Sequence, residues 1–243
     1  VVAAFNNRSF VDYQNAAGGI KASLSETSTV TGDSSVGTDT LVRIDGIKGS
    51  EFDDVFVADK SFRDVAGGKS IRIEGRGGDD TIIGNGSTKA FYRSANAAVT
   101  VDLATGVAQG TDAGDVAGIG TDTLSGVDRI VGSGFDDTLL GSDIDDREEF
   151  SGGAGDDYID GRGGWDRASY LMDDAGVIAN LSSSAVTIAG DTVAAGATRD
   201  GFGDIDTLVN IESLRSSLHD DVLIGSDGAV SYTHLRAHET YVH

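Results

Sequence analysis

A nine-residue repeat, rich in glycine and aspartate, restricts the possible folds of this chain more than any other feature. Its clearest copies are adjacent: GGAGDDYID at Gly152–Asp160 is followed directly by GRGGWDRAS at Gly161–Ser169. Further copies begin at Gly49 (GSEFDDVFV), Gly75 (GRGGDDTII) and Gly132 (GSGFDDTLL). Each copy fits G-x-x-x-x-D-x-U-x, where U is apolar. Glycine at this density opposes a helix and favours tight bends, so the repeat predicts short strands joined by corners.

A second period, of roughly 80 residues, relates longer parts of the chain. The sequence TDTL at 38–41 recurs at 121–124 and, as IDTL, at 205–208. GSEFDD from Gly49 likewise recurs as GSGFDD from Gly132 and as SSLHDD from Ser216. These offsets divide the chain into repeat 1 at 1–92, repeat 2 at 93–170 and a partial repeat 3 at 171–228. The best tandem of nine-residue copies, 132–170, lies in repeat 2.

The hydropathy pattern between these markers also indicates strands. Alternating apolar residues predict strands within 98–103, 176–181 and 19–24, whereas the Gly, Asp and Thr content of 106–120 predicts a loop. After each TDTL the apolar residues are three apart, a spacing that also suits a helical turn, but the flanking Gly and Asp favour short strands. The predicted fold class is all-β, a solenoid of stacked turns, with inward apolar side chains at Ile82, Leu139, Ile159 and Ala168.

The repeat gathers the ligands that a hard cation prefers. Glycines at positions one, two and four permit positive φ, so carbonyl oxygens can face inward at a bend, and the aspartate at position six adds a carboxylate. Ca²⁺ takes about six to eight oxygen ligands in irregular geometry, whereas Mg²⁺ needs a stricter octahedron. One repeat cannot complete such a shell, but stacked repeats can. We therefore expect Ca²⁺ as the cofactor, and we expect its binding to drive folding.

The overall charge agrees with a cationic partner. Eighteen Lys and Arg residues face 40 Asp and Glu residues, for a net charge of −22, which excludes nucleic acid and anionic membrane surfaces as partners. The chain has no cysteine and so has no disulfides or thiolate metal sites. No apolar run is long enough to cross a membrane. The first residues lack both Met and a signal peptide pattern, so we expect an internal piece of a longer polypeptide.

The last fifteen residues differ in composition from the rest. AVSYTHLRAHET at Ala229–Thr240 resembles the translation of a sequencing adapter, so 229–243 is predicted to be a non-native tail. The alternative for this segment is a zinc site built on His234 and His238. It fits poorly, because His243 is one residue too late for the H-E-x-x-H motif.

The nine-residue motif resembles that of the RTX, or haemolysin-type calcium-binding, repeat family of secreted bacterial proteins. The resemblance covers most of 49–228. It implies a right-handed parallel β-roll in which two copies make one turn and Ca²⁺ is held between turns at both edges. It also implies export by a type I system and an extracellular location.

The resemblance also assigns candidate metal ligands. Asp137 and Asp157 are expected at one edge of the roll, with Asp146 and Asp166 at the other. The candidates beside them are the repeat glycines Gly78, Gly153, Gly155 and Gly164 and the aspartates Asp54, Asp80 and Asp221. Four copies depart from the pattern. Ala66–Glu74 has Ile71 at the position of the aspartate, and Ser216–Ile224 has lost its glycines. Gly141–Ser151 carries two extra residues, which puts Asp146 in doubt, and Gly84–Tyr92 has Lys89 at the position of the aspartate.

Two functional classes remain open. The first is a non-catalytic, calcium-stabilised region of a large exported protein, such as an adhesin. The second is the accessory repeat region of an exported protease, lipase or polysaccharide-modifying enzyme, whose catalytic domain lies elsewhere. The chain has no G-x-S-x-G, H-E-x-x-H or EF-hand motif, and pairs of acids are inevitable among 40, so we expect no enzymatic activity. Long degenerate units favour the first class.

Overall fold

The computed structural model describes residues 9–64, 67–188, 190–226, 231–233 and 240–242. Within these residues the fold is all-β and contains no helix, and hence no helix that could cross a membrane. The chain forms two compact units, an N-terminal unit at Val1–Val131 and a C-terminal unit at Gly132–His243. The boundary between these units, after Val131, does not coincide with the repeat boundaries at 92 and 170.

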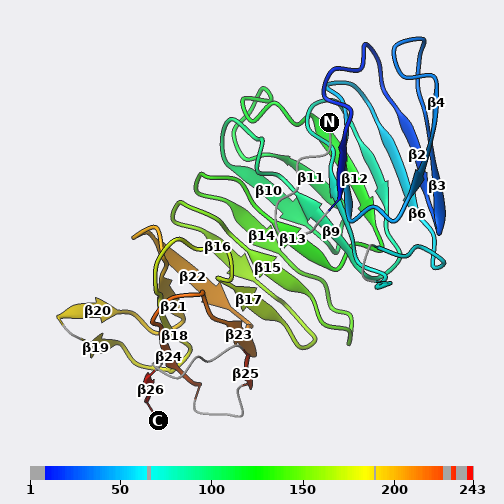
Figure 1. Cartoon of the computed structure of the whole chain (residues 1–243). Helices are drawn as coiled ribbons and strands as arrows, with labels where there is room; N and C mark the ends of the chain where they lie inside the picture. Colours follow the sequence, from blue (N-terminus) through cyan, green and yellow to red (C-terminus); the bar gives the residue numbers. More distant parts are fainter. Residues whose placement is uncertain (1–8, 65–66, 189, 227–230, 234–239, 243) are drawn as a thin grey trace. The chain divides into compact units, whose positions relative to one another are not determined.

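The N-terminal unit consists of two sheets (Figure 1). The first sheet is parallel, in the order β1 (Phe10–Asp12), β5 (Gly46–Lys48), β7 (Ile71–Glu74), β9 (Thr88–Phe91), β13 (Arg129–Val131). The second sheet has the order β10 (Val99–Asp102), β11 (Val107–Gly110), β12 (Thr121–Ser125), β8 (Thr81–Ile83), β6 (Val55–Ala58), β2 (Lys21–Leu24), β3 (Thr27–Thr31), β4 (Thr38–Val42). From β5 to β9 the chain alternates between the two sheets, so successive strands of one sheet are parallel.

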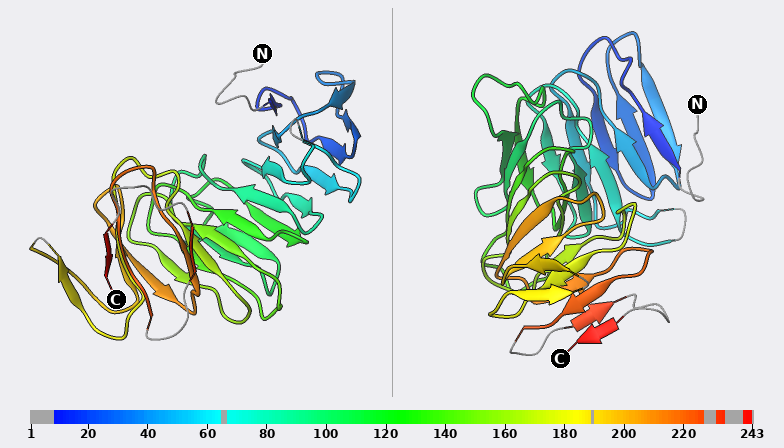
Figure 2. Two further views of the ribbon diagram at one scale, coloured as in Figure 1. Left: turned by 60° about the horizontal axis from the view of Figure 1, so that its bottom comes forward. Right: turned by 90° about the vertical axis from the view of Figure 1, so that its left-hand side faces the viewer.

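The C-terminal unit repeats this plan. Its first sheet has the parallel order β15 (Glu149–Ser151), β17 (Arg167–Ser169), β23 (Ser213–Arg215), β25 (Ser231–Thr233). Its second sheet has the order β26 (Thr240–Val242), β24 (Val222–Ile224), β18 (Ile178–Asn180), β21 (Ala197–Arg199), β22 (Ile205–Val209), β16 (Tyr158–Asp160), β14 (Thr138–Leu140). The hairpin β19 (Val186–Ile188) and β20 (Asp191–Val193) projects from these sheets (Figure 2).

The long sequence period corresponds to a three-stranded antiparallel insertion in the second sheet. The insertions are β2-β3-β4, β10-β11-β12 and β18-β21-β22. Each ends in the strand that contains TDTL or IDTL. The strands predicted within 19–24, 98–103 and 176–181 are thereby confirmed. The loop predicted at 106–120 is wrong in its first part, because Val107–Gly110 pairs on both sides as β11.

The apolar position of the nine-residue repeat forms columns of stacked side chains. In the N-terminal unit, Phe56 lies beside Ile82 and Ile82 beside Leu124. In the C-terminal unit, Leu139, Ile159 and Leu208 are aligned in the same way. Ile82, Leu139, Ile159 and Ala168 are all buried, which confirms the predicted core positions. Burial of such columns is the main favourable contribution to stability.

Part of the segment predicted to be a non-native tail forms strands. Strands β25 and β26 extend the parallel ladders next to β23 and β24. His234, His238 and His243, the residues of the alternative zinc site, lie outside the described residues.

Candidate metal centre

The repeat aspartates lie at the bends that join the two sheets. Gly49–Asp54, Gly75–Asp80, Gly132–Asp137 and Gly152–Asp157 lead from the first sheet to the second, and Gly161–Asp166 leads back. The last aspartate of each bend turns away from solvent. Asp54, Asp80, Asp137, Asp157, Asp166 and Asp221 are each no more than 2% exposed. The structure therefore buries carboxylates at the positions where the sequence predicted ligands.

These carboxylates form ladders of hydrogen bonds from turn to turn. In the N-terminal unit the backbone N–H of Asp54 donates to Asp80 Oδ1 at 2.8 Å, and the N–H of Asp80 donates to Asp122 Oδ1 at 3.0 Å. In the C-terminal unit Asp137 N–H donates to Asp157 Oδ1 at 2.8 Å, and Asp157 N–H donates to Asp206 Oδ1 at 3.1 Å. In each ladder, Oδ1 of one aspartate accepts a hydrogen bond from the backbone N–H of the aspartate on the adjacent turn. That N–H lies in a bend and takes no part in strand pairing, so the carboxylate gives it a partner.

The second oxygen of each carboxylate distinguishes two kinds of bend. In two bends with serine at position two, the serine satisfies the aspartate: Ser133 N–H donates to Asp137 Oδ2 at 2.5 Å, and the Ser133 hydroxyl donates to Oδ1 at 2.7 Å. Ser50 binds Asp54 in the same way. In a third, the Ser217 hydroxyl donates to Asp221 Oδ1 at 2.6 Å, and Asp221 Oδ2 is buried without a partner. Where glycine or arginine occupies position two, Oδ2 of Asp80, Asp157 and Asp166 is buried without a hydrogen-bond partner. We call these the glycine bends, at 75–80, 152–157 and 161–166.

Glycine is required in these bends because neighbouring atoms occupy the space of a side chain. A Cβ on Gly152 would overlap Asp157 Oδ2, so the unpartnered oxygen lies directly against the start of its own bend. Gly153 and Gly155 have φ of +120° and +111°, and there the carbonyl oxygens of Ser133 and Phe135 on the adjacent turn take the place of the Cβ. A glycine bend therefore brings a buried carboxylate oxygen and carbonyl oxygens of the next turn to one region.

Burial dominates the electrostatics of the glycine bends. Burial and, as the second cause, the charge of Asp122 together raise the pKa of Asp80 to about 9. Burial raises the pKa of Asp157 to about 9 in the same way, with Asp206 as the second cause. For Asp166 burial raises the pKa to about 7. An isolated buried carboxylate is costly in its ionised form, so each site favours either a proton or a compensating cation.

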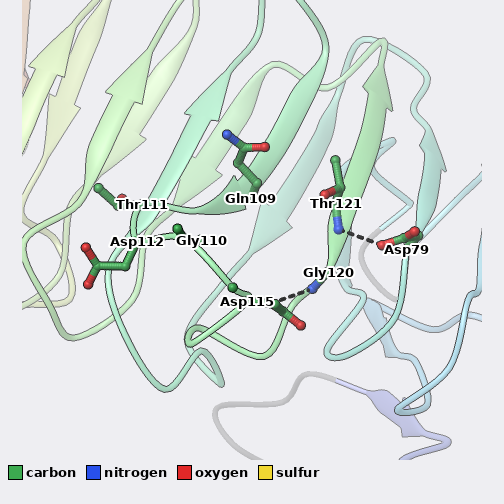
Figure 3. A pocket seen from close by; sticks show the side chains of 10 residues that line it. Asp79, Gln109, Gly110, Thr111, Asp112, Asp115, Gly120 and Thr121 are labelled. Carbon is green, nitrogen blue, oxygen red and sulfur yellow. Dashed lines mark hydrogen bonds between the residues drawn. The ribbon is translucent and has the colours of Figure 1, made fainter.

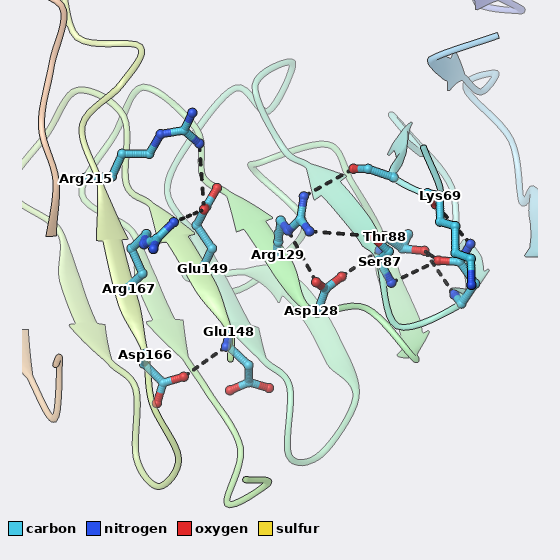
Figure 4. A network of polar contacts seen from close by, with 12 residues as sticks. Lys69, Ser87, Thr88, Asp128, Arg129, Glu148, Glu149, Asp166, Arg167 and Arg215 are labelled. Carbon is cyan, nitrogen blue, oxygen red and sulfur yellow. Dashed lines mark hydrogen bonds and ion pairs between the residues drawn. The ribbon is translucent and has the colours of Figure 1, made fainter. Parts of the chain in front are cut away.

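The return bends correct one predicted ligand. The side chain of Asp146 is exposed, and Glu148 takes the buried position instead. Glu148 accepts from Ser142 at 2.8 Å, and its N–H donates to Asp166 Oδ1 at 3.1 Å (Figure 4). The two inserted residues of this copy move the bend's last position from Asp146 to Glu148. Asp146 contributes only a carbonyl oxygen, which faces Gly164.

A similar shift occurs near Lys89. Thr88, not Lys89, ends the bend that begins at Gly84, and its hydroxyl accepts from Asn85 N–H at 3.1 Å. Thr88 N–H donates to Asp128 Oδ1 at 2.6 Å. This bend carries a neutral hydroxyl at the position that aspartate occupies elsewhere, so it offers a cation no carboxylate of its own.

Sequence reasoning missed the acids that continue the ladders beyond the repeats: Asp122, Asp206 and Glu212, together with Glu148. Asp122 and Asp206 are the aspartates of TDTL and IDTL, and their recurrence with the long period was the available signal. Glu212 accepts Asp166 N–H at 2.8 Å, and no motif marked it. Each of these acids places a second negative charge beside a glycine bend.

Charged residues on the strands of the first sheets pair with one another. Glu149 lies 3.6 Å from Arg167 and 3.9 Å from Arg215, and in the N-terminal unit Arg129 pairs with Asp128 at 3.3 Å (Figure 4). The partners of these arginines are Asp128 and Glu149. None of these ion pairs involves a carboxylate of a glycine bend.

A polar hollow in the N-terminal unit is lined by Asp79, Gln109, Asp112, Asp115 and Thr121, among others (Figure 3). Asp79 Oδ1 accepts Thr121 N–H at 2.8 Å, and Asp115 Oδ1 accepts Gly120 N–H at 3.0 Å. The hollow presents acidic oxygens and no lining cation, so its chemistry suits a cation better than an anionic ligand.

No group of three or more His, Cys, Asp or Glu side chains within the described residues is arranged to hold a metal ion. A metal at a glycine bend would therefore need backbone carbonyls as well as carboxylates. The chain matches no protein-family model, and it matches no curated protein in sequence. The resemblance to RTX repeats consequently rests on the motifs and on the bends that they form.

Proposed function

We propose that this chain is a calcium-binding structural region of a secreted bacterial protein, built as a right-handed parallel β-roll of the RTX type. The observation that carries the proposal is the buried, unpartnered Oδ2 of Asp80, Asp157 and Asp166. All three glycine bends leave the same oxygen without a donor, whereas among the serine bends those at Asp54 and Asp137 do not and the one at Asp221 does. A bound cation accounts for this difference.

The residues at a glycine bend fit Ca²⁺. Asp157 Oδ2 supplies a charged oxygen, and the carbonyls of Ser133 and Phe135 lie against the same bend. When bound, the ion supplies positive charge that offsets the burial of the carboxylate and links adjacent turns. The protein's own contribution is to hold the oxygens together through the aspartate ladder, which fixes Oδ1 and leaves Oδ2 available.

Calcium binding and folding are coupled in this proposal. Without the ion, the ladders stack like charges in adjacent turns, and glycine-rich bends lose much backbone entropy on folding. Binding energy then becomes folding energy. A chain of this kind remains unfolded where calcium is scarce and folds after type I export to a calcium-rich exterior. Its role in the longer polypeptide is structural and non-catalytic.

Calorimetric titration of the full chain with Ca²⁺ tests the proposal. We expect Asp157→Asn and Asp166→Asn each to remove one bound ion, because each loses the charge of an unpartnered oxygen while keeping its shape. The matched control is Asp145→Asn, an exposed aspartate of the same region, which should bind as the unchanged chain does. Equal stoichiometry in all four proteins would show that the glycine bends are not calcium sites.

A further inference from the structure

A second group of unpartnered polar atoms lies in the C-terminal unit, outside every nine-residue copy. Tyr170 follows β17, Thr198 lies in β21, Asp200 follows β21 and Asp206 lies in β22. All four are at least 97% buried. The Tyr170 hydroxyl, Thr198 Oγ1, and Oδ2 of Asp200 and Asp206 each lack a hydrogen-bond partner. Buried polar atoms are rarely left in this state, and four of them in one region call for a ligand.

The four side chains are held together by the antiparallel insertion of repeat 3. Thr198 and Asp206 are direct cross-strand partners in the pairing of β21 with β22. The Tyr170 hydroxyl approaches the carboxylate of Asp206 and the hydroxyl of Thr198, without the geometry of a full hydrogen bond to either, and the charge of Asp200 acts on Asp206. The free atoms therefore converge from three segments of the chain.

The remaining oxygens of the two aspartates are already engaged. Asp206 Oδ1 accepts Asp157 N–H at 3.1 Å. Asp200 Oδ1 accepts the N–H groups of Phe202, Gly203 and Asp204 at 2.8 to 3.0 Å. These bonds fix both carboxylates by one oxygen and leave the other available.

The charge in this region has no protein counterpart among the contacts that the structure describes. Arg167 and Arg215 pair with Glu149, and Arg199 pairs with Asp191 at 3.0 Å, while the buried Nε of Arg199 has no hydrogen-bond partner. Asp200 and Asp173 place further negative charge beside Asp206. Asp173 itself is held by Gly201 N–H at 3.0 Å. A buried group of acids without a basic partner is stable only when protonated or when it binds a cation.

We propose that Asp200, Asp206, Tyr170 and Thr198 bind one Ca²⁺ ion in the C-terminal unit, at a site distinct from the glycine bends. The free atoms are all oxygens, which excludes a metal that needs sulfur or imidazole ligands. Mg²⁺ usually retains several waters, and a site this deeply buried suits the more fully dehydrated Ca²⁺. The site does not require the glycine bends to bind calcium.

The other repeats provide an internal comparison. In repeat 1, Val30 pairs with Asp39, and the Tyr13 hydroxyl donates to Asp39 at 2.9 Å. In repeat 2, Ala108 occupies the position opposite Asp122. Only in repeat 3 does that cross-strand position, at Thr198, carry an oxygen. Thr198 is therefore the residue that distinguishes this site from its two counterparts.

The test uses the full chain and two variants that touch no bend, Thr198→Val and Tyr170→Phe. Each removes one hydroxyl and preserves side-chain shape. Calcium is titrated calorimetrically, and Tb³⁺, a luminescent substitute for Ca²⁺, is titrated with excitation through tyrosine. We expect each variant to weaken one site by about 10-fold to 100-fold, and Tyr170→Phe to lose most of the sensitised emission from that site. Circular dichroism in calcium checks that each variant is folded.

Asp206→Asn and Asp166→Asn separate this proposal from the previous one. Asp206→Asn should remove the ion of this site, and Asp166→Asn should leave it in place. If Asp166→Asn loses no ion while Thr198→Val weakens one, the glycine-bend proposal fails and this one stands. If Thr198→Val and Tyr170→Phe both bind with the stoichiometry and affinity of the unchanged chain, the site does not exist.

Discussion

Without calcium, the free energy of unfolding of this chain is expected to fall as the pH rises from about 5 to about 8. The groups responsible are Asp80 and Asp157. Burial and, as the second cause, the charges of Asp122 and Asp206 raise the pKa of each to about 9 in the folded state. In an unfolded chain an aspartate has a pKa of about 3.9. Between these values the folded state binds more protons than the unfolded state.

The direction of the effect follows from this difference. The stabilisation is fully present below about pH 4 and is lost as the pH rises towards about 9, at about 1.4 kcal/mol per pH unit for each group. Asp33 and Asp59, whose pKa values are lowered by hydrogen bonds to Ser35 and Ser61, are ionised in both states throughout the window and do not oppose the trend. The loss across the window amounts to several kcal/mol.

Urea unfolding of calcium-free protein, followed by circular dichroism at the acidic pH values where protonation of these carboxylates keeps the chain folded, measures this slope, and the chain should be unfolded without urea by neutral pH. Asp157→Asn is the matched variant, because it removes one titrating group and retains the acceptor for Asp137 N–H, so its slope should be shallower. Saturating calcium should reverse the dependence, since protons then compete with the ion. A calcium-free stability that is constant or rises between the two pH limits would contradict the buried, unpaired state of these carboxylates.

Gly155→Ala is expected to destabilise the calcium-bound protein by about 3 kcal/mol, among the largest effects of a single methyl group. Gly155 has φ of +111°, which side chains rarely adopt. Its added Cβ would lie 2.5 Å from the carbonyl carbon of Phe135 and 2.8 Å from Asp136 N on the adjacent turn. On the other side, Gly155 N–H donates to Asp204 at 2.9 Å, so the bend cannot move away.

The matched control is Gly190→Ala. Gly190 has a similar φ of +103°, but nothing lies within 4 Å of its Cβ position. It should therefore show only the backbone strain, about 1 kcal/mol. Thermal or urea unfolding of both variants in calcium separates strain from the clash between turns. Equal destabilisation of the two variants would mean that the turns do not approach as closely as the structure indicates.

Much of the fold could be predicted from sequence, because each nine-residue copy has the same order of bend residues and strand residues in the sequence and in the structure. A fixed spacing between the bend aspartate and the apolar strand residue placed Ile82, Leu139 and Ile159 in the core. The strand at Val107–Gly110 was missed because its partners, β10 and β12, lie on both sides of it in space, and the glycines around it resemble those of a loop.

The site was less predictable because its chemistry depends on contacts between turns. Glu148 replaces Asp146 because an insertion shifts which residue reaches the buried position. Asp122 and Asp206 lack the preceding glycines of the repeat. The recurrence of TDTL and IDTL marked them as repeated residues, but only their stacking beside Asp80 and Asp157 shows their role in the ladders. Serine at position two was visible in the sequence, but its role as a donor that satisfies Asp137 becomes evident only from the bend geometry.

The most direct test of the central claim, that calcium stabilises the stacked bends, is far-ultraviolet circular dichroism of the full chain at neutral pH. The spectrum is recorded in a chelating buffer, then with millimolar calcium, and then after the chelator is restored. We expect a disordered spectrum that becomes β-rich with calcium and reverts when calcium is removed. A β-rich spectrum that is the same in all three conditions would contradict it.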